Sequence, residues 1–438
     1  MLALQIYKPL NRLLPLGFCL VYLFILILLM QNYFLWNSNV FIGLALAPYI
    51  CSVENGKRSL RYLIPALLMS GIALMMAVKT TLFLAMIFAV LLLAENLWGK
   101  INSVLLFLLL LISPLFAYAS SLFGFPIRLW LSEVAARIIG FLGIKASASG
   151  NMITLDNYEF SVDQACAGLN MLATSLIICL FIISFYQRKL GKQLSFLQIV
   201  LLLTGTIGLN IVCNLFRIIL LVLFKVMPGN FMHDGIGVIC LLGYVIIPLL
   251  LFTKLFTKRY VKTKTNEESR FNLISHLRYP LLHFLFLMMM ISITLNLKPM
   301  DKVSQSYNPI RLNGFKKEIL ENGIIKFENK EALIYMKSTA FYASEHNPMV
   351  CWKGSGYDFK FIKKQIIKGK EIYTGTLIKG KDKIYSAWWF DNGTIKTINQ
   401  LNWRWHAAKG EKKFYLVNVN AANPSHLKSI TEWMIARK

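Results

Sequence analysis

The chain has 438 residues, of which 56% are apolar and only 16% are charged, whereas soluble domains average about 25% charged residues. This composition excludes an ordinary soluble enzyme, and the apolar excess lies almost entirely before Pro299. A net charge of +26 would indicate nucleic-acid binding in a soluble protein. Here the basic residues lie between long apolar runs or in the C-terminal third, so they indicate membrane topology, and we expect no nucleic-acid partner.

Long apolar runs predict about nine helices that cross the lipid bilayer, since a spanning helix needs about 20 mainly apolar residues. Two of them fit between Arg12 and Glu54, where no charged residue occurs. The pattern leaves the number of spans within residues 35–100 open. The other seven are predicted at 62–78, 80–98, 101–123, 168–186, 194–224, 235–253 and 280–297.

Lys and Arg residues cluster in alternate loops between these runs. Loops on the cytoplasmic side of a membrane carry such an excess, so the clusters predict a cytoplasmic N-terminus. Nine spans then place the C-terminus outside, in a multi-pass protein of the cell inner membrane. The clusters are Lys8 and Arg12, Lys57 with Arg58 and Arg61, Lys100, Arg188 with Lys189 and Lys192, and the basic residues of 254–278.

The predicted fold is mainly α-helical, with a polytopic helix bundle followed by a small α+β domain. We divide the chain into a transmembrane domain at 1–260, a cytoplasmic basic loop and last spanning helix at 261–298, and an extracytoplasmic domain at 299–438. Within the bundle, residues 124–165 form an outer loop with an amphipathic stretch that we expect at the membrane interface. In the last domain, alternating apolar residues and Gly-Lys turns at 365–390 predict a β-meander.

The predicted topology brings Cys166, Arg217 and His233 to the outer face from three consecutive helices. A thiol attacks a carbonyl as the thiolate, which a helix N-terminus or a neighbouring cation favours. His233 is a candidate general base for the thiol proton, and Arg217 a candidate partner of the thiolate or of an oxyanion. Taken singly, each residue has a structural explanation: a buried small cysteine, an arginine that reaches lipid headgroups, and a loop histidine.

Three further residues are candidates for supporting roles. Asp163, or else Ser161, is a candidate N-cap that would put Cys166 in the first turn of the next helix. Asn214 lies one helical turn before Arg217 and either bonds into the site or packs between helices. Asp234 either orients the imidazole of His233 or caps the following helix.

The sequence predicts no cofactor and no metal site. Its seven cysteines include no C-x-x-C pair, and five of them fall inside apolar runs, which is typical neither of zinc ligands nor of a disulfide framework.

The run GNMITLDNYEFSVDQACAGLN, followed by NLFRI and by MHDGIG, resembles the exosortase/archaeosortase family of multi-pass membrane cysteine transpeptidases. The matching positions are Cys166, Ala167 and Gly168, then Asn214, Arg217 and Ile218, then His233. The resemblance covers about residues 15–260. It implies that Cys166, Arg217 and His233 are the catalytic residues.

A second resemblance lies in SEHNPMVCWKGSGYDF, which is similar to a motif of the exopolysaccharide-associated domain found beside or fused to many exosortases. The matching residues are His346, Pro348, Cys351, Gly356 and Tyr357, and the resemblance gives them no role. Fusion to a ninth span resembles the exosortase N type. For Cys351 we consider a disulfide with Cys166, a second reactive thiol, or a buried small residue, and favour burial.

The resemblance implies an enzyme that cleaves C-terminal sorting signals of exported proteins through a thioester acyl-enzyme. Its partners would be exported substrates bearing a short motif, a transmembrane helix and a basic tail, within the lipid bilayer. One alternative is an inner-membrane lipid-linked glycan polymerase or ligase, which needs no thiol. Another is a scaffold or transporter whose cationic site holds an anion. The sequence identifies neither the cleavage motif, nor the acceptor, nor the oligomeric state.

Overall fold

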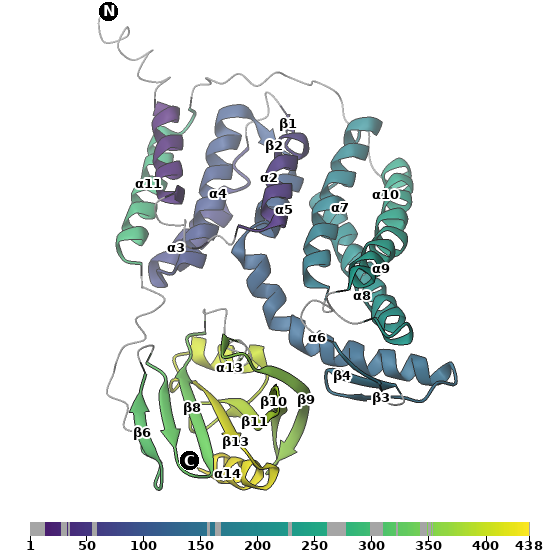
Figure 1. Ribbon diagram of the computed structural model, residues 1–438. Coiled ribbons are helices and arrows are strands. Elements are labelled where there is room, and N and C mark those ends of the chain that lie inside the picture. The colour runs from purple at the N-terminus through teal and green to yellow at the C-terminus, as the bar shows by residue number, and fades with distance from the viewer. Residues whose placement is uncertain are drawn as a thin grey trace, which may run out of the picture. The chain divides into compact units, whose positions relative to one another are not determined.

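The structure is a computed structural model, shown in Figure 1. It describes residues 14–27, 33, 36–54, 59–155, 158–162, 168–226, 230–260, 277–297, 310–320, 323–341, 348, 352 and 354–437. Most of the helices precede residue 300, and most of the strands follow it.

Each predicted span coincides with apolar helix among the described residues. In the described part of the chain, four helical stretches are long and apolar enough to cross a membrane, or five if α5 and α6 form one span, and four further apolar helices have 10–17 residues each. Nine spans therefore stay a prediction. The helices are Leu14–Ile27, α2 Ser38–Ile50, α3 Leu63–Met75, α4 Lys79–Trp98, α5 Ser103–Leu111, α6 Pro114–Phe141, α7 Leu169–Leu190, α8 Phe196–Leu223, α9 Phe231–Leu241, the π-helix η2 Leu242–Ile246, α10 Ile247–Tyr260 and α11 Pro280–Leu295.

The predicted span 101–123 is divided between two helices. Helix α5 ends at Leu111, and α6 begins at Pro114, where proline is tolerated because the first helical N–H has no partner within the helix. Helix α6 then continues to Phe141. The amphipathic stretch expected within the outer loop is therefore the second half of a long helix.

Polar contacts link segments of the apolar region that are separate in sequence. The carboxylate of Glu95 is fully buried, lies 2.6 Å from Nη2 of Arg61, and accepts a 2.9 Å hydrogen bond from the N–H of Ile101. His283 lies in α11, and its Nε2 is 3.1 Å from Nδ2 of Asn96 in α4. Polar groups are costly at such positions unless they are paired, so these contacts favour one packing of α4 against its neighbouring segments.

A small antiparallel sheet follows α6. Its strands are β3 Ala146–Ser149, β4 Met152–Leu155 and β5 Tyr158–Ser161, in sequential order. Ser161 pairs with Met152 and closes β5, and the described part of α7 begins only at Leu169. Residues 163–167 lie outside the described residues, so the cap of the next helix, Asp163 or else Ser161, stays a prediction.

The C-terminal region contains an eight-stranded antiparallel sheet with the order β6-β7-β8-β13-β11-β10-β9, in which β12 pairs with β11. The predicted meander is confirmed as β9, β10 and β11, whose two turns contain Gly369 and Gly380 at positive φ. The strands are β6 Lys316–Ile319, β7 Ile325–Glu328, β8 Ala332–Ser338, β9 Asp358–Ile367, β10 Lys370–Lys379, β11 Asp382–Asp391, β12 Lys396–Thr397 and β13 Tyr415–Ala421.

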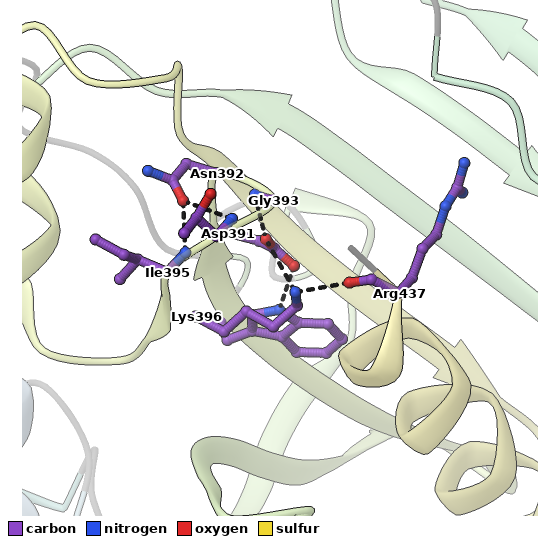
Figure 2. A network of polar contacts seen from close by, with 8 residues as sticks. Asp391, Asn392, Gly393, Ile395, Lys396 and Arg437 are labelled. Atoms are coloured by element: carbon purple, nitrogen blue, oxygen red, sulfur yellow. Dashed lines mark hydrogen bonds and ion pairs between the residues drawn. The ribbon is translucent and has the colours of Figure 1, made fainter.

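Helices α13 Gln400–Ala408 and α14 Pro424–Ala436 also belong to this region. A polar network ties the end of α14 to the sheet (Figure 2). Asp391 accepts a hydrogen bond from the indole N–H of Trp389 at 3.2 Å and from the N–H of Gly393 at 2.7 Å. Lys396 lies 3.7 Å from Asp391 and donates to the carbonyl of Arg437 at 2.8 Å. Because Trp389 is fully buried, these bonds anchor the helix end to the core of the domain.

The chain forms two compact units. One comprises Met1–Tyr118, Asn170–Val212 and Leu241–Pro299, and the other comprises Ala119–Leu169, Cys213–Cys240 and Met300–Lys438. The second unit therefore combines the C-terminal sheet with β3–β5 and with the segment around Arg217 and His233. The boundaries predicted at residues 260 and 299 follow the expected membrane topology, whereas the two compact units group residues that contact one another. The predicted boundaries therefore stay a prediction.

Candidate functional site

Arg217 and His233 contact one another although they come from different helices. Arg217 lies in α8 and His233 in the first turn of α9, and Nη2 of Arg217 is 3.4 Å from Nδ1 of His233. The two residues are 5% and 3% exposed. An arginine that served only to reach lipid headgroups would not need to turn its guanidinium toward a buried imidazole. The contact thus brings together two of the three predicted catalytic residues.

The imidazole of His233 has a second neighbour on the same nitrogen. Oδ1 of Asp234 lies 3.2 Å from Nδ1, and the Asp234 side chain is 86% exposed. When Nδ1 carries the proton, it donates to Asp234 and leaves Nε2 as a basic nitrogen; when Nδ1 is unprotonated, it accepts from Arg217. Asp234 also lies in the first turn of α9, where a negative charge is favourable, so both predicted roles are compatible.

Gly237 allows α9 to approach Arg217 closely. A Cβ atom at this position would lie 3.1 Å from Nε and 3.2 Å from Cζ of Arg217, tighter than most real contacts. Gly237 is one helical turn after His233, so the same face of α9 holds the imidazole and receives the guanidinium. Sequence reasoning did not identify Gly237, although the DGIG run that contains it was part of the matching motif.

We expect Gly237→Ala to lower the activity of this site about tenfold, because the added methyl group displaces the guanidinium from His233. Gly235→Ala is a matched control on the same helix, since its Cβ would meet nothing within 4 Å. The measurement is the rate of substrate processing in membranes that contain equal amounts of each protein. Equal rates for the two variants would show that the guanidinium position does not limit activity.

Asn214 contacts the start of the preceding helix. Gly168 has φ +68° and lies immediately before α7, and a Cβ on it would be 3.0 Å from both Cγ and Oδ1 of Asn214. A left-handed conformation and a close neighbour both favour glycine here. Cys166 lies two residues before Gly168 in the sequence. Cys166 and Asp163 themselves fall outside the described residues, so their predicted roles stay predictions.

The arrangement offers a permanent cation next to an imidazole in a region shielded from water. Arginine remains charged at any accessible pH, and burial strengthens its effect on a nearby anion. A histidine in this position can exchange a proton with a nucleophile or with a leaving group. Such a pair is suited to chemistry in which negative charge develops on sulfur or oxygen.

The described residues of the second motif include two that contact side chains of the C-terminal sheet. The indole N–H of Trp352 donates to Oδ1 of Asn418 at 3.1 Å, and the Lys379 ammonium lies 5.4 Å from the ring centre of Tyr357. Buried Pro348 and half-buried Trp352 line a cavity of about 220 Å³ on this face. His346 and Cys351 are outside the described residues, and the motif keeps no assigned role.

The described part of the chain contains five cysteines, all with free thiols. Within that same part, no group of three or more His, Cys, Asp or Glu side chains is arranged to hold a metal ion.

Residues 4–251 match the family described as transmembrane exosortase (Exosortase_EpsH). The match covers more than half of the chain and includes the Arg217–His233 contact. The chain belongs to this family. No curated protein and no solved structure matches the chain. Family membership, together with the long apolar helices, identifies this exosortase as a membrane protein.

Proposed function

We propose that this exosortase is a cysteine protease or transpeptidase that cleaves C-terminal sorting signals of exported proteins. The observation that carries the proposal is the contact between buried Arg217 and His233, inside a chain that belongs to the exosortase family. Cys166 supplies the nucleophile. The fused C-terminal domain supports the narrower assignment to the exosortase N type.

The reaction proceeds in two halves. Nε2 of His233 takes the proton of the Cys166 thiol, and the thiolate attacks the carbonyl carbon of the scissile peptide bond. Arg217 stabilises the negative charge on sulfur and then on the carbonyl oxygen. The C–N bond breaks, His233 returns the proton to the leaving amine, and the acyl group remains on sulfur as a thioester. An amine or water then attacks the thioester and restores the free thiol.

The substrate is a membrane-anchored protein. A transmembrane helix that matches the bilayer thickness would present its outer flank at the depth of the proposed site. A basic tail after that helix would remain in the cytoplasm under the rule that orients the enzyme. These arguments support a signal composed of a short motif, a helix and a basic tail.

The proposed function is tested by trapping the thioester. Purified exosortase is incubated with a candidate substrate, quenched in acid and digested, and the Cys166 peptide is analysed by mass spectrometry. The expected result is a mass increase equal to the acyl fragment, which disappears after hydroxylamine treatment. A Cys166 peptide that stays unmodified while substrate is consumed would exclude the covalent mechanism.

The proposed topology makes a separate prediction. In spheroplasts, a membrane-impermeant maleimide should label Lys381→Cys in the exposed β10–β11 turn, and should label Thr265→Cys only after the membrane is disrupted. Each variant is made in an otherwise cysteine-free chain. The reason is the alternate clustering of Lys and Arg, which places residue 265 inside and the C-terminal domain outside. The reverse labelling pattern would contradict both the topology and an outward-facing site.

A further inference from the structure

Asn151 links two parts of the second compact unit that are far apart in sequence. It is 3% exposed and lies at the turn between β3 and β4. Its N–H donates to the carbonyl of Ile362 in β9 at 3.2 Å, and its Oδ1 accepts from the N–H of Ile362 at 2.9 Å. Both backbone groups of one residue in the C-terminal sheet are thus bound by one asparagine.

The same asparagine also holds the end of β5. Its carbonyl accepts from the N–H of Val162 at 2.8 Å, and its Nδ2 donates to Oγ of Ser161 at 3.4 Å. Val162 is fully buried and precedes Cys166 by four residues. On the other side of Cys166, Gly168 lies against Asn214. The chain is therefore held on both sides of the nucleophile segment, and on one side Asn151 provides the attachment.

Strand β9 is irregular at the point of contact. Thr374 pairs with Lys363 and Thr376 pairs with Lys360, so Phe361 and Ile362 together face the single residue Gly375. Such a bulge frees backbone groups from the sheet, and Phe361 adopts a left-handed φ of +54°, uncommon for a bulky residue. The Ile362 groups turned out of the sheet are those that Asn151 binds.

The fit around this contact is close. Gly150 has φ +65°, and a Cβ on it would lie 1.6 Å from the carbonyl oxygen of Ile362, which only glycine permits. Elsewhere in this unit, the rings of Phe125 in α6 and Tyr373 in β10 pack edge to face, with ring centres 5.0 Å apart. Burial raises the pKa of Tyr373 to about 12, so the ring stays neutral and the contact is independent of pH in the physiological range.

We propose that the C-terminal domain positions the Cys166 segment through Asn151, which makes Asn151 a positioning residue and gives the domain a role in the reaction. The inference rests on the proposed function. Backbone strain and a buried polar cluster persist only where the surrounding structure holds them, and here both occur at one contact between the domain and β5. Without that contact, the thiol would be presented less accurately to His233 and Arg217, and kcat would fall while substrate binding is retained.

The test uses the full-length protein in lipid nanodiscs as wild type, Gly150→Ala, Asn151→Ala, Asn151→Asp and Gly143→Ala. Gly143→Ala is the matched control, because Gly143 also has positive φ, at +82°, but a Cβ there meets nothing within 4 Å. Asn151→Asp retains an oxygen acceptor for Ile362. Hydrogen exchange of peptides covering 158–162 and 358–367 reports the contact, and kcat and KM for processing report its role.

In Gly150→Ala and Asn151→Ala we expect at least tenfold faster exchange in both peptides and at least a tenfold lower kcat, with KM within twofold of wild type. Gly143→Ala should match wild type, and Asn151→Asp should recover most of the lost kcat. Faster exchange with kcat within twofold of wild type would overturn the proposal, and so would unchanged exchange in both Ala variants. A general loss of folding in the Ala variants would instead raise exchange throughout the chain. The Asn151→Asp variant then decides. If its peptide 158–162 is protected from exchange but its kcat does not recover, the proposal is overturned.

Failure of the proposed function has a different signature. Wild type and Cys166→Ala would then process substrate at equal rates. The alkylation rate of Cys166 by iodoacetamide, in chains that retain only this cysteine, then decides whether the domain positions the segment. A change of at least fivefold in Asn151→Ala but not in Gly143→Ala supports the positioning role, and equal rates in all chains overturn it.

Discussion

Replacement of Cys166 by alanine should abolish substrate processing, with a loss of at least about 10⁴-fold, because a covalent mechanism has no route without its nucleophile. Cys166→Ser should be nearly as inactive, since a hydroxyl is far harder to deprotonate than a thiol. Cys351→Ala should retain most of the activity, because we expect this cysteine to be a buried residue of the C-terminal domain. Processing is measured as conversion of an epitope-tagged substrate at equal enzyme abundance.

The activity of Cys166→Ser also distinguishes the proposed function from its main alternative. A lipid-linked glycan polymerase or ligase would not depend on a thiol, so full activity of Cys166→Ser would favour that class of enzyme.

Non-reducing electrophoresis after proteolysis between the two modules tests for a Cys166–Cys351 disulfide. Fragments that stay joined until reductant is added would make Cys166 structural and would contradict the enzyme proposal.

Arg217→Lys should lower processing by about 10²–10³-fold, which is the typical cost of losing one donor to an oxyanion. Lysine retains the charge, but its single ammonium cannot reproduce the planar fork that lies beside both His233 and Gly237. Arg137→Lys is the matched control. Arg137 is 67% exposed and pairs with Glu133 on the surface of α6, so its replacement should leave activity unchanged.

The same site should show non-additive effects. If Arg217 and His233 act on one step, the Arg217→Ala/His233→Ala double variant should be no worse than the more damaging single variant. Single-turnover kinetics in membranes measures the three values. Multiplicative losses would indicate that the two side chains act independently, and would weaken the interpretation of their 3.4 Å contact as a catalytic unit.

The positions of most apolar helices, the meander predicted at 365–390 and membership of the family could be predicted from the sequence. Each of these depends on residues that are close in the chain: a run of apolar side chains, an alternation broken by glycine turns, or a short motif. Local patterns of this kind are largely independent of the rest of the fold. The single helix expected at 101–123 is instead divided between α5 and α6, because an apolar run does not by itself mark where one helix ends and the next begins.

Only the tertiary structure determined which residues meet. Insertion of β13 between β8 and β11, the approach of Gly237 to Arg217, and the pairing of Asn151 with Ile362 join residues whose separation in sequence carries no periodic signal. The two glycines at 150 and 237 are ordinary in sequence and become informative once the neighbouring atom is known. Such contacts depend on the packing of distant elements, and that packing is decided by shape complementarity and paired polar groups across the whole unit.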